Sequence, residues 1–100
     1  MKRDFAGAHV PEADYVFLRD SNRDAFPPTY EAWTALVKEG TDLAAQMGYP
    51  TDPINVDVGE FLSWCQSTEI NPCLDAMRAF LIIKRWGLKG ALSGSHRKAP

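Results

Sequence analysis

Two cysteines are the residues best suited to nucleophilic, redox or metal chemistry. Cys65 and Cys73 lie eight positions apart and are the two cysteines of the chain. A thiol at a helix N-terminus has a lowered pKa, so a pair joined by a turn could form a redox couple. Zinc needs four ligands, however, and the two histidines, His9 and His96, lie near opposite ends of the sequence. The pattern therefore favours two small apolar side chains packed in a core.

Other catalytic signatures are weak. Two groups of acidic residues lie close in sequence: Asp14, Asp20 and Asp24, and Asp52, Asp57 and Glu60. Carboxylates act as general acids only when burial raises their pKa, and helix caps and turns explain these groups better. No Gly-x-Ser-x-Gly turn presents a serine, and no glycine-rich loop is suited to phosphate binding. The sequence predicts a protein that is not an enzyme and uses no cofactor or metal.

The charges are unevenly distributed. The net charge is -2, but residues 1–73 sum to -7 and residues 74–100 to +5. The cations of the basic end are Arg78, Lys84, Arg85, Lys89, Arg97 and Lys98. Two helices joined by a turn near residues 69–71 would give a helix-turn-helix outline, with these cations on DNA bases and phosphates. Asp75 near the helix start and a pI of about 5.6 weaken this alternative hypothesis. Cations near a helix C-terminus also simply complement its dipole.

The same region carries a surplus of apolar side chains. Residues 79–83 are apolar nearly all round the expected helix, which is more than one face can bury in a small domain. The excess predicts a non-enzymatic module for binding another protein or a second copy of itself. The residues expected to bind the partner are Phe80, Ile82, Ile83, Trp86 and Leu88. Simple core packing is the competing interpretation.

Three helices must position these groups. Apolar residues at steps of three and four predict a helix from Tyr30 to Met47, ended by Gly48 and Pro50. Gly40 within that helix costs about 1 kcal/mol relative to alanine, which suggests close approach by a neighbouring element.

The next two helices have recognisable starts. Asp57 is expected to cap a helix over residues 58–68, with Glu60 reaching back to the cap. Asn71 is expected to cap the third helix, with Pro72 as its first residue, and Gly87 is expected to end it.

The segment from residue 11 to 20 is ambiguous. Residues 15–18 could form a strand that pairs with residues 54–58, or Pro11 could open a short helix. The predicted fold is therefore mainly α, a small domain of three to four helices. The alternative is a small α+β fold with short strands near 15–19 and 54–58.

Length and composition limit the remaining possibilities. One hundred residues suit a single domain, expected over residues 11–89, with a flexible lead-in over 1–10 and a mobile basic tail over 90–100. The longest apolar run falls far short of the ~20 residues that span a bilayer. Few cysteines and no apparent export signal predict a cytoplasmic protein that does not enter membranes.

Overall fold

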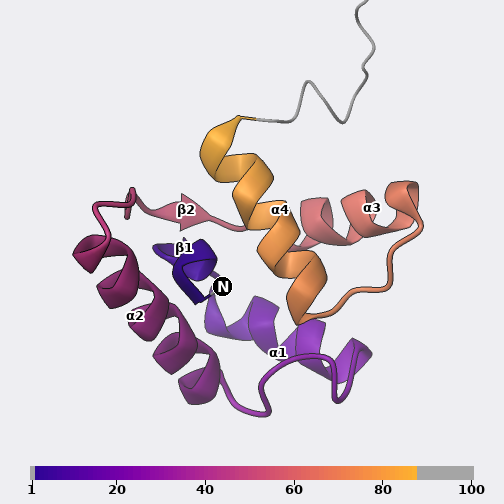
Figure 1. Ribbon diagram of the computed structural model, residues 1–100. Coiled ribbons are helices and arrows are strands. Elements are labelled where there is room, and N and C mark those ends of the chain that lie inside the picture. The colour runs from indigo at the N-terminus through magenta and orange to yellow at the C-terminus, as the bar shows by residue number, and fades with distance from the viewer. Residues whose placement is uncertain (1, 88–100) are drawn as a thin grey trace, which may run out of the picture.

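The computed structural model describes residues 2–87 and shows a mainly helical chain with one pair of short strands (Figure 1). The elements in chain order are a 3₁₀ turn η1 (Lys2–Phe5), β1 (Ala8–His9), α1 (Glu12–Ser21), α2 (Tyr30–Gln46), β2 (Ile54–Asn55), α3 (Val58–Thr68) and α4 (Leu74–Trp86). The predicted mainly α class is confirmed. The predicted tail over 90–100 lies outside the described residues.

Two helices begin where their capping residues allow. The Thr29 hydroxyl accepts a hydrogen bond from the Ala32 amide at 3.0 Å at the start of α2. The Asp57 carboxylate accepts from the Glu60 amide at 3.1 Å and begins α3, as predicted. The Glu60 carboxylate does not complete the expected capping box, because it pairs with the Lys84 ammonium at 2.6 Å. This side chain therefore joins α3 to α4.

The start of α4 differs from the prediction. The helix begins at Leu74, and its cap is the Cys73 thiol, which accepts from the Ala76 amide at 3.4 Å. The prediction of Asn71 and Pro72 was wrong because the Leu74 amide donates to the Ala25 carbonyl at 3.0 Å, and so ties the segment to a distant loop. The end of α4 at Gly87 is as predicted, with that glycine at φ 68°.

The first ten residues were expected to be flexible, but residues 2–10 form part of the core. β1 pairs in parallel with β2, Ala8 opposite Ile54 and His9 opposite Asn55. Phe5, Ala6 and Val10 are buried. These side chains give the segment enough buried apolar surface to offset the entropy of ordering it.

The strand alternative was half right. Residues 54–55 do form a strand, but residues 15–19 lie within α1. Tyr15 and Leu18 are both buried, which is the three-residue spacing of one helix face. The Tyr15 hydroxyl donates to the Pro27 carbonyl at 2.6 Å, and burial raises the pKa of Tyr15 to about 12.

The close approach predicted at Gly40 is confirmed. A Cβ at this position would collide with the carbonyl oxygen of Lys2, so only glycine lets η1 lie directly on α2. The Gly7 amide donates to the Thr41 hydroxyl one residue further along α2, at 3.1 Å. The Phe5 ring meets Trp33 of the same helix edge-on, with centroids 6.0 Å apart. The N-terminal segment is thus fixed along most of α2.

Candidate interaction surface

The two sides of α4 have opposite environments. Its inner side carries the buried residues Ala76, Met77, Phe80 and Leu81. Its outer side carries Asp75, Ala79, Ile82 and Trp86, at steps of four, three and four. At 3.6 residues per turn these four positions fall within an arc of about 60°. In Figure 1, α4 crosses the front of the molecule with no other element lying over it.

The structure divides the predicted partner-binding residues between these two sides. Phe80 is only 3% exposed and packs against Phe61 with ring centroids 5.4 Å apart, so it cannot meet a partner in the folded chain. Ile82 and Ile83 are half-buried, and Trp86 is 46% exposed. Leu88 lies outside the described residues. The exposed apolar surface of α4 is therefore narrower than the sequence suggested, since Phe80 and Leu81 are buried in the core.

Tyr49 of the α2–β2 connection contacts the outer side of α4, and Arg3 joins Tyr49 to Met47 of the same connection. The Tyr49 ring meets Trp86 edge-on with centroids 5.4 Å apart. The Arg3 guanidinium lies over Tyr49 at 4.4 Å and donates to the Met47 sulfur at 3.9 Å. Met47 is itself exposed. Ala79, Ile82, Trp86, Tyr49 and Met47 are called the α4 surface from here on. Met47 and Tyr49 carry no sequence signal linking them to Trp86, because more than thirty residues separate them in the chain.

The described cations of the basic end are engaged within the molecule. Arg78 donates to Asp4 at 3.3 Å, and Lys84 pairs with Glu60 at 2.6 Å. Arg85 donates to the carbonyls of Ala6 at 2.6 Å and Asp52 at 2.8 Å. Binding DNA through these side chains would compete with contacts that hold the N-terminal segment and α3 in place. The remaining cations of that hypothesis, Lys89, Arg97 and Lys98, lie outside the described residues.

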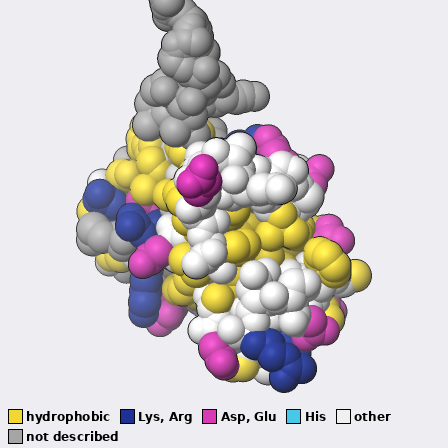
Figure 2. Space-filling model, turned by 90° about the vertical axis from the view of Figure 1, so that its right-hand side faces the viewer, with side chains coloured by type: hydrophobic (Ala, Val, Ile, Leu, Met, Phe, Trp, Pro, Cys, Tyr) yellow, Lys and Arg dark blue, Asp and Glu magenta, His cyan; other side chains and the backbone are white. Residues whose placement is uncertain are grey.

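A second pair of exposed apolar residues lies on α1, where Val16 is 42% and Phe17 59% exposed. Being consecutive, they point about 100° apart around the helix. The positions three and four residues from Phe17 are Ala13, Asp14, Asp20 and Ser21. No apolar stripe therefore continues from Phe17. Figure 2 shows the side of the molecule on which α1 and α3 end, where apolar groups gather across the middle and acidic groups lie mainly around the edge.

The cysteines favour a structural role. Burial, and then the nearby Cys73 thiol, raise the pKa of Cys65 to about 11, so this thiol stays protonated near neutral pH. Cys73 is half-buried and caps α4. Within residues 2–87, no group of three or more His, Cys, Asp or Glu side chains is placed to hold a metal ion.

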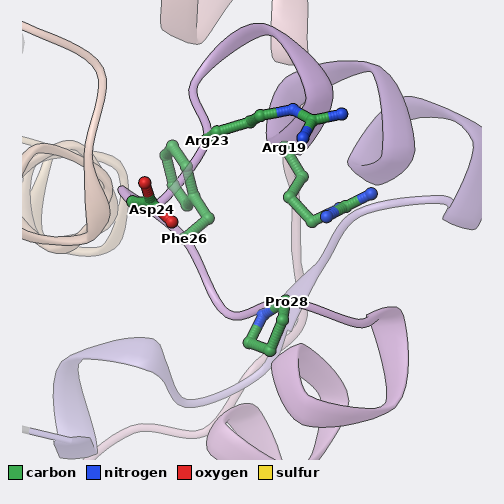
Figure 3. Close-up of a pocket in the computed structure, with 5 residues that line it drawn as sticks. All are labelled: Arg19, Arg23, Asp24, Phe26 and Pro28. Atoms are coloured by element: carbon green, nitrogen blue, oxygen red, sulfur yellow. The ribbon is translucent and has the colours of Figure 1, made fainter.

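A shallow hollow of about 360 Å³ lies beside the end of α1, lined by Arg19, Arg23, Asp24, Phe26 and Pro28 (Figure 3). Arg19 is already paired with Asp20 at 2.8 Å. The Arg23 side chain extends toward Arg19 and away from Asp24 (Figure 3).

Outside comparisons add no assignment. Comparison with models of protein families, with curated proteins and with solved structures finds no match to this chain. In the part of the chain that the structure describes, none of the helices has both the length and the apolar character needed to cross a membrane.

Proposed function

We propose that this chain is a non-enzymatic protein-interaction module and that the α4 surface is its binding site. The observation that supports the proposal is the outward row of Ala79, Ile82 and Trp86, extended by Tyr49 and Met47. Exposed apolar residues in one row lose unfavourable contact with water when a partner covers them. Tryptophan and tyrosine are also enriched among the residues that dominate binding energy. A cytoplasmic location, expected from the cysteine usage, belongs to the same proposal.

The α4 surface is favoured over nucleic-acid binding for an electrostatic reason. The three described cations of the DNA hypothesis already contact Asp4, Glu60 and two backbone carbonyls. Phosphate binding depends on cations that are free to replace condensed counterions. By contrast, Trp86 and Ile82 have apolar surface facing outward that no described element covers completely.

Site-specific photo-crosslinking in cells tests the proposal. A benzophenone amino acid replaces Ile82 in one variant and Phe17 in a matched variant. Both probes then lie on a helix, at a half-exposed position in the first variant and at an exposed position in the second. We expect discrete crosslinked protein bands from position 82 and a weak, diffuse pattern from position 17. The bands from position 82 should disappear when Trp86→Asp is added, because a buried charge without a partner opposes binding.

The controls decide the outcome. Far-UV circular dichroism must show that both probe variants and the Trp86→Asp variant fold. If position 82 gives no discrete band, or if position 17 gives the same bands, the α4 surface is not the binding site and the proposal is wrong.

A further inference from the structure

We infer that the occupant of the α4 surface is a second copy of this chain, with the two α4 helices packed antiparallel across a two-fold axis. The inference rests on the proposed function and specifies its partner. Two features of α4 support it: the distribution of charge along the helix and the increase in side-chain size from Ala79 through Ile82 to Trp86 on its outer side.

The charges of α4 are opposite at its two ends. Asp75 lies in the first turn with its side chain 92% exposed and its carboxylate 4.0 Å from the Arg78 guanidinium, and Lys84 and Arg85 lie in the last turn. Among residues 2–87, Arg85 donates to two neutral carbonyls and forms no ion pair, so no carboxylate balances its charge. Antiparallel packing brings Asp75 of each copy to the basic end of the other and also opposes the two helix dipoles. Parallel packing would place like charges together.

The sizes of the outer residues fit the same arrangement. The steps of four, three and four from Asp75 to Trp86 are the spacing with which two helices pack along a shared seam. A two-fold axis between residues 79 and 82 places the small Ala79 of one copy opposite Ile82 of the other. Because alanine leaves room for the larger side chain, the helices can approach closely at the centre. Trp86 then covers the outer end of the seam near Asp75 of the second copy.

The interface predicted in this way is small. One helix pair with Tyr49 and Met47 at its ends belongs to the lower size class of protein interfaces, below about 1,200 Å². We therefore expect a reversible dimer with a dissociation constant on the order of 10–100 μM.

Sedimentation equilibrium of the purified full chain tests the inference over about 1 μM to 1 mM. We expect wild type to shift from monomer to dimer with rising concentration. Ile82→Asp should weaken association at least about 30-fold, the effect of a central interface residue, while Phe17→Asp should leave it unchanged. Wild type that stays monomeric throughout, or loss of dimer on Phe17→Asp alone, overturns the inference.

The charge argument has its own test. Asp75→Lys should weaken the dimer about 3- to 10-fold, since it replaces an attraction with a repulsion. Rising salt should weaken wild-type association and strengthen that of Asp75→Lys, because screening acts on opposite signs. If Asp75→Lys strengthens the dimer, the helices do not pack antiparallel.

Disulfide trapping checks the direction of packing. In a Cys73→Ser background, whose serine preserves the helix cap, a single Asp75→Cys substitution places two thiols about 16 Å apart along an antiparallel pair at 1.5 Å rise per residue. No disulfide should form under mild oxidation, whereas Ala79→Cys should form one readily because its two copies lie beside the axis. Rapid trapping through position 75 would show parallel packing and overturn the inference.

Failure of the inference differs from failure of the proposed function. A purified chain that stays monomeric, together with discrete crosslinks from position 82 to a different protein, rejects the second copy and supports the α4 surface. A monomeric chain that also gives no crosslink at position 82 rejects both.

Discussion

The N-terminal segment, residues 2–10, and the outer side of α4 lie next to each other and have opposite environments. The N-terminal segment has its apolar residues Phe5, Ala6 and Val10 turned into the core and its backbone paired with β2. The outer side of α4 leaves Trp86 exposed and Ile82 half-exposed. Arg85 links the two regions through its hydrogen bond to Ala6. The comparison shows that apolar content does not by itself mark a binding surface, since what matters is whether the fold has another element to cover it.

The comparison predicts that substitutions in the first region change the free energy of unfolding and that those in the second change association. The largest effect is expected for Phe5→Ala. Removing a buried aromatic ring should lower the free energy of unfolding by about 3–5 kcal/mol. Phe17→Ala removes the same ring from an exposed position and should change it by less than about 0.5 kcal/mol. Urea denaturation measures both, and equal losses would mean that the N-terminal segment is not part of the core.

Gly40→Ala should lower the free energy of unfolding by about 1–3 kcal/mol, because the new methyl group pushes the Lys2 carbonyl away from α2. Helix propensity alone would make the substitution stabilising by about 1 kcal/mol, so the sign of the effect is decisive. Ala45→Gly is the reverse exchange at an exposed position of the same helix. It therefore measures the contribution of helix propensity to the free energy of unfolding. A stabilised Gly40→Ala variant would contradict the close packing of η1 on α2.

High pH should weaken the core near Cys65. Its pKa is raised from 9.0 to about 11 in the folded chain, so the protonated thiol stabilises folding fully below about pH 9. As the pH rises to 11, thiols of the unfolded state ionise first, and about 2 kcal/mol of stability is lost. Denaturation of wild type and Cys65→Ala at pH 8 and pH 11 measures this. The variant lacks the titrating thiol and should lose less stability over the interval; equal losses would show that Cys65 is not responsible.

Only a small effect on stability is expected on the α4 surface. Trp86→Ala should lower the free energy of unfolding by only about 0.5–1 kcal/mol, the value of its edge contact with Tyr49. The same substitution should weaken the dimer in sedimentation experiments, although less than Ile82→Asp at the centre of the seam. A loss of stability as large as that of Phe5→Ala would place Trp86 in the core and remove the contrast between the two regions.

Local sequence determined the parts of this protein that depend on neighbouring residues. The start of α3, with its Asp57 cap, and the end of α4 at Gly87 follow from side chains within four positions of those helix ends. Gly40 was also informative. Because glycine is unfavourable inside a helix, its presence there predicted that a neighbouring element packs closely against it.

Tertiary structure decided the rest. Only the fold determines that residues 2–10 find α2 and β2, and that Ala25 draws the start of α4 to Leu74. It also separates Phe80 from Ile82, two residues of one apolar run, into core and surface. It brings Tyr49 to Trp86 across 37 positions of the chain. The physical reason is that burial and long-range pairing depend on which elements meet in space, and neither helix propensity nor hydrophobic spacing contains that information.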